Sequence, residues 1–155
     1  MTTIGIDPGP TPGVCILGAG TPVILQCDAD SLIPLIGHFV ELYADLEQWG
    51  PLHLAVEAWA VGSIGRTNVK AGELIRDQVG SIRSFATIGP DTKVYVHART
   101  ASAVKPWATD RRLAAAGLFK RTTGMPHARD SCRHALFSHV RDSGAPDPLS
   151  RSRAK

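Results

Sequence analysis

Four side chains in this sequence could together hold divalent cations: Asp7, Glu57, His127 and Asp130. Asp7 and Glu57 each end a short apolar run that favours a β-strand, while His127 and Asp130 are three residues apart at the start of an expected helix. Carboxylate oxygens suit hard cations such as Mg²⁺ and Mn²⁺, and imidazole can join them. Two such ions can activate water and stabilise the leaving oxygen in phosphodiester hydrolysis. These residues make a nuclease the first hypothesis.

Each of the two strand-end carboxylates also has an ordinary explanation. Asp7 precedes Pro8-Gly9, and aspartate in that position is common in turns that have no catalytic role. Glu57 lies in the run Leu54–Trp59, which carries no other charge. An unpaired carboxylate buried in such a run is costly, and a bound metal would offset that cost. Metal binding is therefore the favoured interpretation of Glu57.

The helical positions have alternatives as well. Asp130 would be a favourable charge in a first helical turn whatever its chemistry. His127 could begin the helix or contact DNA; as a metal ligand it would bind as neutral imidazole, so activity would fall in mildly acidic solution. His134 lies four residues after Asp130 on the same helical face. It could be an extra ligand or support one, although a packed or hydrogen-bonded histidine is the more common case.

The basic residues are distributed unevenly along the chain. All 17 Lys and Arg lie after residue 60, whereas the first 60 residues hold seven of the 14 Asp and Glu. A solvated surface would account for this pattern, and so would an electrostatic footprint for a polyanion beside an acidic metal pocket. Under the second interpretation the candidate phosphate contacts are Arg66, Lys70, Arg111, Arg112, Lys120 and Arg121.

The bulk composition indicates a single globular domain. The chain has 155 residues, of which 43% are hydrophobic and 20% charged, and these values suit one domain with a sizeable core. No apolar run approaches the roughly 20 residues of a membrane span, and no signal peptide is evident. Cys15, Cys27 and Cys132 have no CxxC spacing and are expected to be buried thiols in a reducing compartment. The expected location is cytoplasmic.

Apolar periodicity and chain breakers predict the order of the secondary structure. Strands are expected at Thr3–Ile6, Val14–Leu17, Val23–Cys27, His53–Glu57 and Lys93–His97. Long helices are expected at about Leu32–Gln48 (after a cap at Asp30 or Ser31), Val69–Thr87 and His127–Arg141, with two short helices between Thr100 and Leu118. The order β-β-β-α-β-α-β-α predicts an α/β fold, a five-stranded mixed sheet with helices on both faces. Residues 1–142 would form the domain, and residues 143–155 a disordered tail.

With its motifs in this order, the sequence resembles the RuvC family of Holliday junction resolvases, which have the ribonuclease H-like fold. The family's opening, second and closing motifs match Gly5-Ile6-Asp7-Pro8-Gly9, Ala55-Val56-Glu57 and His127-x-x-Asp130. Ala103-Val104-Lys105 resembles the segment that brings a lysine to the family's active site. The resemblance covers about residues 3 to 141. Ser131–His134 departs from the small, apolar sequence that usually follows the closing aspartate, and Pro106-Trp107 departs from the family's pattern as well.

The resemblance implies a structure-selective DNA endonuclease that resolves four-way junctions by paired phosphodiester hydrolysis. Two Mg²⁺ or Mn²⁺ ions would be held by Asp7, Glu57, His127 and Asp130. Lys105 would stabilise the phosphate in the transition state. The products would carry 5′-phosphate and 3′-hydroxyl ends.

The resemblance also implies a homodimer, which would place two active sites on one branched substrate. The apolar stripe of the expected Val69–Thr87 helix could serve that interface or pack in the core. The Val61–Ile64 loop would probe the junction centre, with Ile64 or Trp59 as the inserted side chain. No nucleotide cofactor and no membrane are expected.

Three other functions remain open from the sequence. The protein could cut other branched DNA, such as replication forks or flaps, or it could bind junctions without cutting them. The second possibility predicts the loss of a catalytic carboxylate, and all of the expected ones are present. An actin-like kinase or ATPase also opens with Gly-Ile-Asp-x-Gly, but those proteins need two such domains, and 155 residues are too few.

Overall fold

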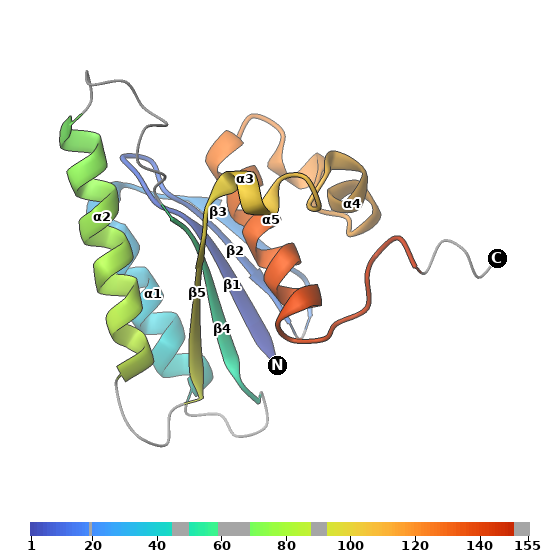
Figure 1. The fold of residues 1–155 in the computed structure, drawn as a ribbon, viewed down its shortest axis with the longest axis horizontal. Coiled ribbons are helices and arrows are strands. Elements are labelled where there is room, and N and C mark those ends of the chain that lie inside the picture. Colours follow the sequence, from blue (N-terminus) through green and yellow to red (C-terminus); the bar gives the residue numbers. More distant parts are fainter. Residues whose placement is uncertain (19, 45–49, 59–68, 88–92, 151–155) are drawn as a thin grey trace.

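The fold is described from a computed structural model of the chain, which defines residues 1–18, 20–44, 50–58, 69–87 and 93–150. Five strands form one mixed sheet in the order β3-β2-β1-β4-β5. The antiparallel meander consists of β1 (Thr2–Asp7), β2 (Gly13–Leu17) and β3 (Val23–Gln26). Two further strands, β4 (Leu52–Glu57) and β5 (Val94–Arg99), run parallel to β1 (Figure 1). The predicted sheet is confirmed.

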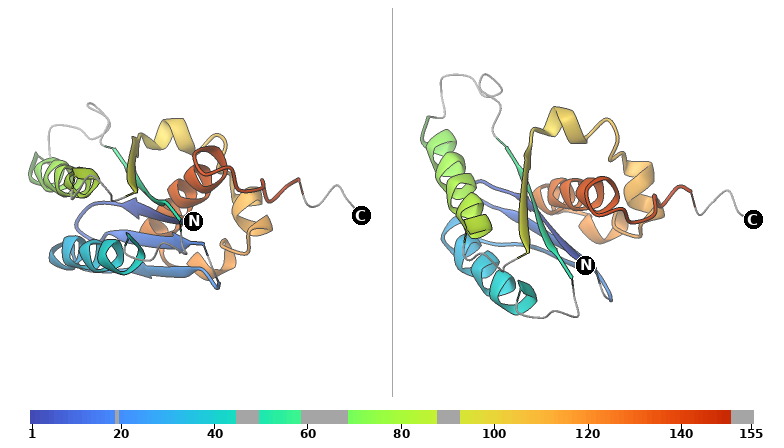
Figure 2. Two further views of the ribbon diagram at one scale, coloured as in Figure 1. Left: turned by 90° about the horizontal axis from the view of Figure 1, so that it is seen from below. Right: turned by 60° about the horizontal axis from the view of Figure 1, so that its bottom comes forward.

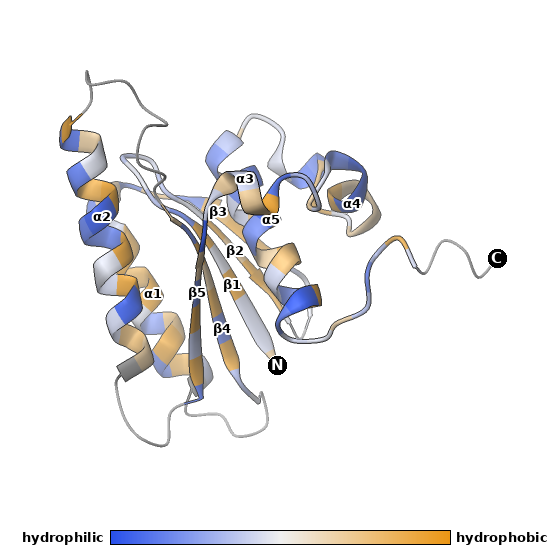
Figure 3. Ribbon diagram, in the orientation of Figure 1, coloured by the Kyte–Doolittle hydropathy of each residue, from blue (hydrophilic) through white to orange (hydrophobic). Residues whose placement is uncertain are grey.

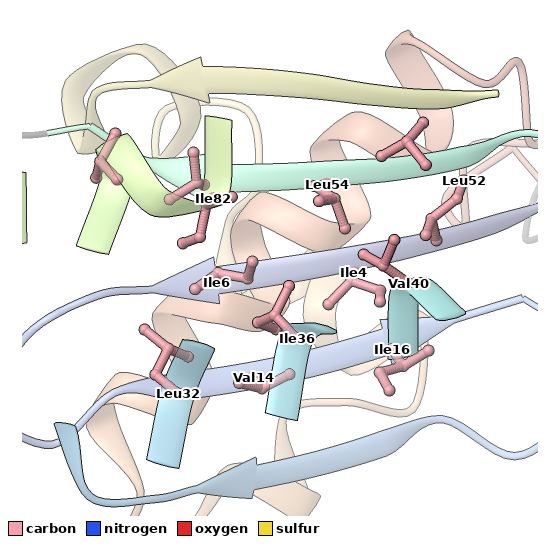
Figure 4. Close-up of a cluster of buried hydrophobic side chains, with 13 residues drawn as sticks. Ile4, Ile6, Val14, Ile16, Leu32, Ile36, Val40, Leu52, Leu54 and Ile82 are labelled. Atoms are coloured by element: carbon pink, nitrogen blue, oxygen red, sulfur yellow. The ribbon is translucent and has the colours of Figure 1, made fainter. Parts of the chain in front are cut away.

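One face of the sheet packs against α1 (Ala29–Ala44) and α2 (Val69–Ser84), which is followed by the short 3-10 helix η2 (Phe85–Thr87). Because side chains alternate along a strand, even-numbered residues such as Ile4, Ile6 and Leu54 point toward these helices. Their partners in the fully buried core include Leu32, Ile36 and Ile82 (Figure 4).

The first long helix begins earlier than predicted. Asp28 accepts the backbone N–H and the hydroxyl of Ser31 at its carbonyl and carboxylate oxygens. The helix therefore starts at Ala29, and neither Asp30 nor Ser31 is its cap. On α2, the predicted stripe residues Val79 and Ile82 are buried and Ile75 packs against the same core.

The other face is covered by α5 (Pro126–Arg141) and by three short elements, α3 (Ala101–Val104), α4 (Asp110–Ala115) and the 3-10 helix η3 (Lys120–Thr122). Figure 2 shows α1 and α2 on one side of the sheet and α5 on the opposite side. A second apolar cluster joins Cys15 and Leu17 of the sheet to Cys132 and Leu136 of α5. The helices on both faces confirm the predicted architecture, and η3 is an addition to it.

Two glycines let α5 lie directly on the strands. A Cβ atom at Gly5 would overlap the backbone of Ser131 and Ala135, and one at Gly13 would overlap the backbone of His127. Any larger residue at either position would push the helix away from the sheet. The close approach therefore fixes the height of α5 above the strand ends.

Residues after α5 continue along the same layer. The carboxylate of Asp142 accepts two hydrogen bonds from the Arg99 guanidinium, at 2.7 and 2.8 Å. Arg112 donates to Asp147 at 3.3 Å and to the Trp107 carbonyl at 2.9 Å, and its guanidinium stacks on the Trp107 ring. These contacts hold residues 142–150 beside α4 and α5, and they give Trp107 a structural role that the sequence did not suggest.

The colouring by hydropathy in Figure 3 agrees with this layering, since the central strands carry much of the hydrophobic colour and α2 alternates between hydrophobic and hydrophilic turns. Among the helices of the described ranges, none combines the length and the apolar character that crossing a membrane requires.

Candidate active site

Asp7 and Glu57 lie side by side at one end of the sheet. They end the neighbouring parallel strands β1 and β4, in which Ile6 is paired with Val56. Both residues have odd numbers, so both side chains point to the face that α5 covers. Asp7 is 8% exposed and Glu57 is half-buried. The topology thus brings together two of the carboxylates that the sequence singled out.

The first turns of α5 pass over these carboxylates and provide a histidine to each. Nδ1 of His127 lies 2.9 Å from Oδ2 of Asp7. Two turns later, Nε2 of His134 lies 3.2 Å from Oε2 of Glu57. The spacing of seven residues keeps both imidazoles on the helical face that looks toward the sheet.

Asp130 lies between these histidines in the sequence, and its carboxylate is paired with two basic side chains. Lys105, which follows α3, places Nζ 2.9 Å from Oδ2 of Asp130. Arg133 donates to the other carboxylate oxygen at 3.0 Å. Arg133 also donates to the Ala108 carbonyl at 3.2 Å and contacts the Asp110 carboxylate, which links Asp130 to the segment before α4.

The two strand-end carboxylates differ in their affinity for protons. Burial, together with the charges of Glu57 and Asp130, raises the pKa of Asp7 to about 6, although His127 opposes the shift. Burial also acts to raise the pKa of Glu57, but the hydrogen bond and charge of His134, helped by Lys105 and His127, outweigh it and lower that pKa. Asp7 therefore experiences a cluster of negative charge.

Two glutamine side chains that the sequence did not single out position these residues. Oε1 of Gln26, at the end of β3, accepts the backbone N–H groups of His127 and Ala128 at 3.1 and 3.2 Å and so caps α5. Buried Gln78 of α2 accepts the Gly9 N–H at 2.8 Å and donates to the Gly9 carbonyl at 3.2 Å. Gln26 thus fixes the start of α5, and Gln78 fixes the turn that follows Asp7.

No three His, Cys, Asp or Glu side chains of the described ranges are arranged so that they could hold a metal ion as they stand. The carboxylates are paired with basic side chains instead, as described above. The chemistry of the donors nevertheless fits a hard divalent cation, because such an ion would offset both the burial and the neighbouring negative charge that raise the pKa of Asp7. This set of donors therefore suits Mg²⁺ or Mn²⁺.

The predicted DNA contacts fall into three groups. Lys70, Arg111 and Lys120 are exposed. Arg112 is occupied by Asp147 and Trp107, and Arg121 donates to the Pro22 carbonyl. Arg66 lies outside the described residues, as do Trp59 and the Val61–Ile64 loop.

Comparisons with known proteins identify the fold. No protein-family model matches the chain, and no curated protein matches it significantly. Among solved structures, T. thermophilus RuvC in complex with a Holliday junction substrate is 19% identical, with a TM-score of 0.59, and the match covers 94% of this chain and 96% of that one. A second Thermus thermophilus RuvC structure is 17% identical, covers 93% and 97%, and has a TM-score of 0.45. The first of these matches shows that the chain has the fold of that RuvC structure, the ribonuclease H-like fold expected from the sequence.

Proposed function

We propose that this protein is a metal-dependent endonuclease that cuts four-way DNA junctions. The observation that carries the proposal is the gathering of Asp7, Glu57 and Asp130 at one end of the sheet, where burial, and then the charges of Glu57 and Asp130, raise the pKa of Asp7. A cluster of like charges is costly unless a cation is bound there. The solved RuvC that shares the fold was captured with a Holliday junction substrate, and this supports branched DNA as the substrate class.

The proposed ligands of two Mg²⁺ or Mn²⁺ ions are Asp7, Glu57, His127 and Asp130. When bound, such ions supply an activated water and charge stabilisation for the leaving oxygen. Two present contacts must break before these side chains can bind metal: the contact of His127 with Asp7 and that of Lys105 with Asp130. The side chains of His127 and Lys105 are 47% and 44% exposed, so each has room to reorient.

Lys105 has a second task in this proposal. Its ammonium group lies against Asp130, at the place where a reacting phosphate would meet the carboxylates. Once Asp130 binds a cation instead, Nζ can donate to a phosphate oxygen and stabilise the charge that develops there. Lys105 is thus proposed to bind the reacting phosphate.

The remaining phosphates of a junction need basic groups outside the site. Lys70 is in the first turn of α2. This turn lies at the end of the sheet where β1 and β4 have their carboxyl ends (Figure 1). Arg111 and Lys120 are exposed on the layer of α5. Arg112 and Arg121 belong to the same proposed surface, and they would reach DNA only by leaving their present partners. Symmetric cutting of a junction further requires two sites, so a homodimer is part of the proposal.

Cleavage of a synthetic four-way junction tests the proposal, with linear duplex, fork and flap substrates as controls. We expect paired nicks in Mg²⁺ or Mn²⁺ that disappear with EDTA and with Asp7→Asn. Glu41→Gln is the matched control, because it removes a carboxylate from the exposed surface of α1 and should leave cleavage unchanged. Sealing of the nicks by DNA ligase would identify 5′-phosphate and 3′-hydroxyl ends.

The alternatives give different outcomes in the same experiment. Equal or faster cutting of forks or flaps would replace the junction resolvase with a broader branched-DNA nuclease. Tight junction binding with no cleavage in either metal would indicate a binding module and contradict the catalytic proposal.

A further inference from the structure

His134 combines deep burial with a polar contact, and ordinary core packing does not require both. Its side chain is 2% exposed, yet Nε2 lies 3.2 Å from a carboxylate oxygen of Glu57. A buried imidazole costs free energy unless its nitrogens find partners. Here the partner is one of the proposed metal ligands, so the contact links the interior of α5 to the site.

The backbone around His134 is held against the sheet. Ser131 and Ala135, on either side of it in the helix, both lie directly over Gly5 of β1. With the helix fixed at these points and the ring buried, the imidazole has little freedom to move away from Glu57. His127 differs in this respect, because its exposed ring can turn toward an incoming ion.

We propose that His134 is a positioning residue whose Nε2–H donates to Oε2 of Glu57 and so holds this carboxylate in the orientation in which it would bind the metal. The inference rests on the metal requirement of the proposed function. It gives separate roles to the two histidines of α5 that contact Asp7 and Glu57, with His127 as a ligand and His134 as the group that orients a ligand. Groups that orient a ligand in this way commonly change metal affinity about 10- to 100-fold when they are removed.

A titration with Mn²⁺, followed by thermal unfolding of the protein without DNA, tests the inference. His134→Leu removes the donor and should raise the Mn²⁺ concentration for half-maximal stabilisation about tenfold or more. His134→Gln places an amide N–H near the position of Nε2 and should restore the titration to within about threefold of the original. His134→Asn is too short to reach Glu57; it should behave like His134→Leu and replaces that variant if the latter does not fold.

The matched control is His139→Leu on the same helix. It removes a histidine whose Nδ1 lies 3.0 Å from the Thr3 hydroxyl, away from the carboxylates. It should lower stability and leave the Mn²⁺ midpoint unchanged. A purely structural His134 would behave in the same way as this control.

Three results would overturn the inference. His134→Leu could leave the Mn²⁺ midpoint unchanged, His134→Gln could raise the midpoint as much as His134→Leu does, or the original protein could show no stabilisation by Mn²⁺. Failure of the proposed function looks different. If the protein cuts no branched DNA while the Mn²⁺ titration depends on His134 as expected, the nuclease proposal falls and the assignment of His134 stands.

Discussion

At the scale of single residues, Asp7 shows how a site can oppose the stability of the protein that contains it. Its carboxylate is buried beside Glu57 and Asp130, and its pKa is raised to about 6 from a usual 3.8. A raised pKa in the folded state means that the ionised form is penalised relative to the unfolded chain. The penalty is fully present above about pH 6 and is relieved as the pH falls toward 3.8.

Asp7→Asn should therefore stabilise the metal-free protein at pH 8. The pKa difference, in which the opposing contact with His127 is already included, corresponds to a gain on the order of 2–3 kcal/mol. Urea denaturation in EDTA should show the gain shrinking toward zero between pH 6 and pH 4. Glu41→Gln is the reference variant, and a gain that does not vary with pH would refute the charge explanation.

Lys105 should matter for catalysis far more than for stability. Its ion pair with Asp130 is substantially exposed, and exposed pairs contribute little, about 0–1 kcal/mol. Lys105→Gln should slow junction cleavage about 100- to 1,000-fold while the melting temperature changes only slightly. Lys93→Gln, which removes another exposed lysine, is the control. Unchanged cleavage rates in Lys105→Gln would exclude Lys105 from the site.

At the scale of elements, the site depends on the contact of α5 with two strands. Gly5→Ala or Gly13→Ala would force a methyl group into the backbone of the helix, and overpacking of this kind costs about 1–3 kcal/mol or more. Gly80→Ala is the matched control, because a Cβ atom there meets open space within α2 and should stabilise by about 0.5–1 kcal/mol. Equal effects of the three substitutions on urea denaturation would contradict this account of the helix–sheet contact.

The positions of the strands follow from local patterns in the sequence, whereas contacts between distant residues do not. Short apolar runs bounded by chain breakers placed all five strands within two residues of their ends, because strand burial is a local pattern. The four proposed metal ligands stood out because each ends a strand or begins a helix. Gln26 and Gln78 did not stand out, since their partners are about 100 and 69 residues away along the chain and no local pattern records such a contact. Arg133 was likewise not singled out, and its partner Ala108 lies 25 residues away along the chain.

At the scale of the whole molecule, stability should depend on three histidines away from Asp7, Glu57 and Asp130. Burial lowers the pKa of His53, and its neighbour His97, 3.0 Å away, lowers it further. Burial also lowers the pKa of His97, against the charge of Asp142, and the pKa of His139. Each folded pKa lies below the unfolded value of 6.5, so the unfolded chain takes up protons first as the solution is acidified.

The free energy of unfolding in EDTA should consequently fall as the pH decreases from 7.5 to 5.5. Protonation of Asp7 acts in the opposite direction near pH 6, so the fall should be steeper in Asp7→Asn, by up to about 1 kcal/mol at pH 5.5. Urea denaturation of both proteins at several pH values checks this. Stability of Asp7→Asn that is constant or increases toward pH 5.5 would show that the buried histidines do not control the response.

The placement of α5 also constrains the order in which the molecule can be made. The helix at residues 126–141 covers the face of a sheet that begins at residue 2, so the Asp7–His127 contact closes a loop of most of the chain. Contacts of such long range form late in folding, because the entropy of closing the loop must be overcome first. During synthesis the carboxylates of β1 and β4 will be present, but uncovered, until α5 leaves the ribosome. A nascent chain therefore exposes the apolar surface under α5 before its site is complete. A chaperone would bind the chain during this period.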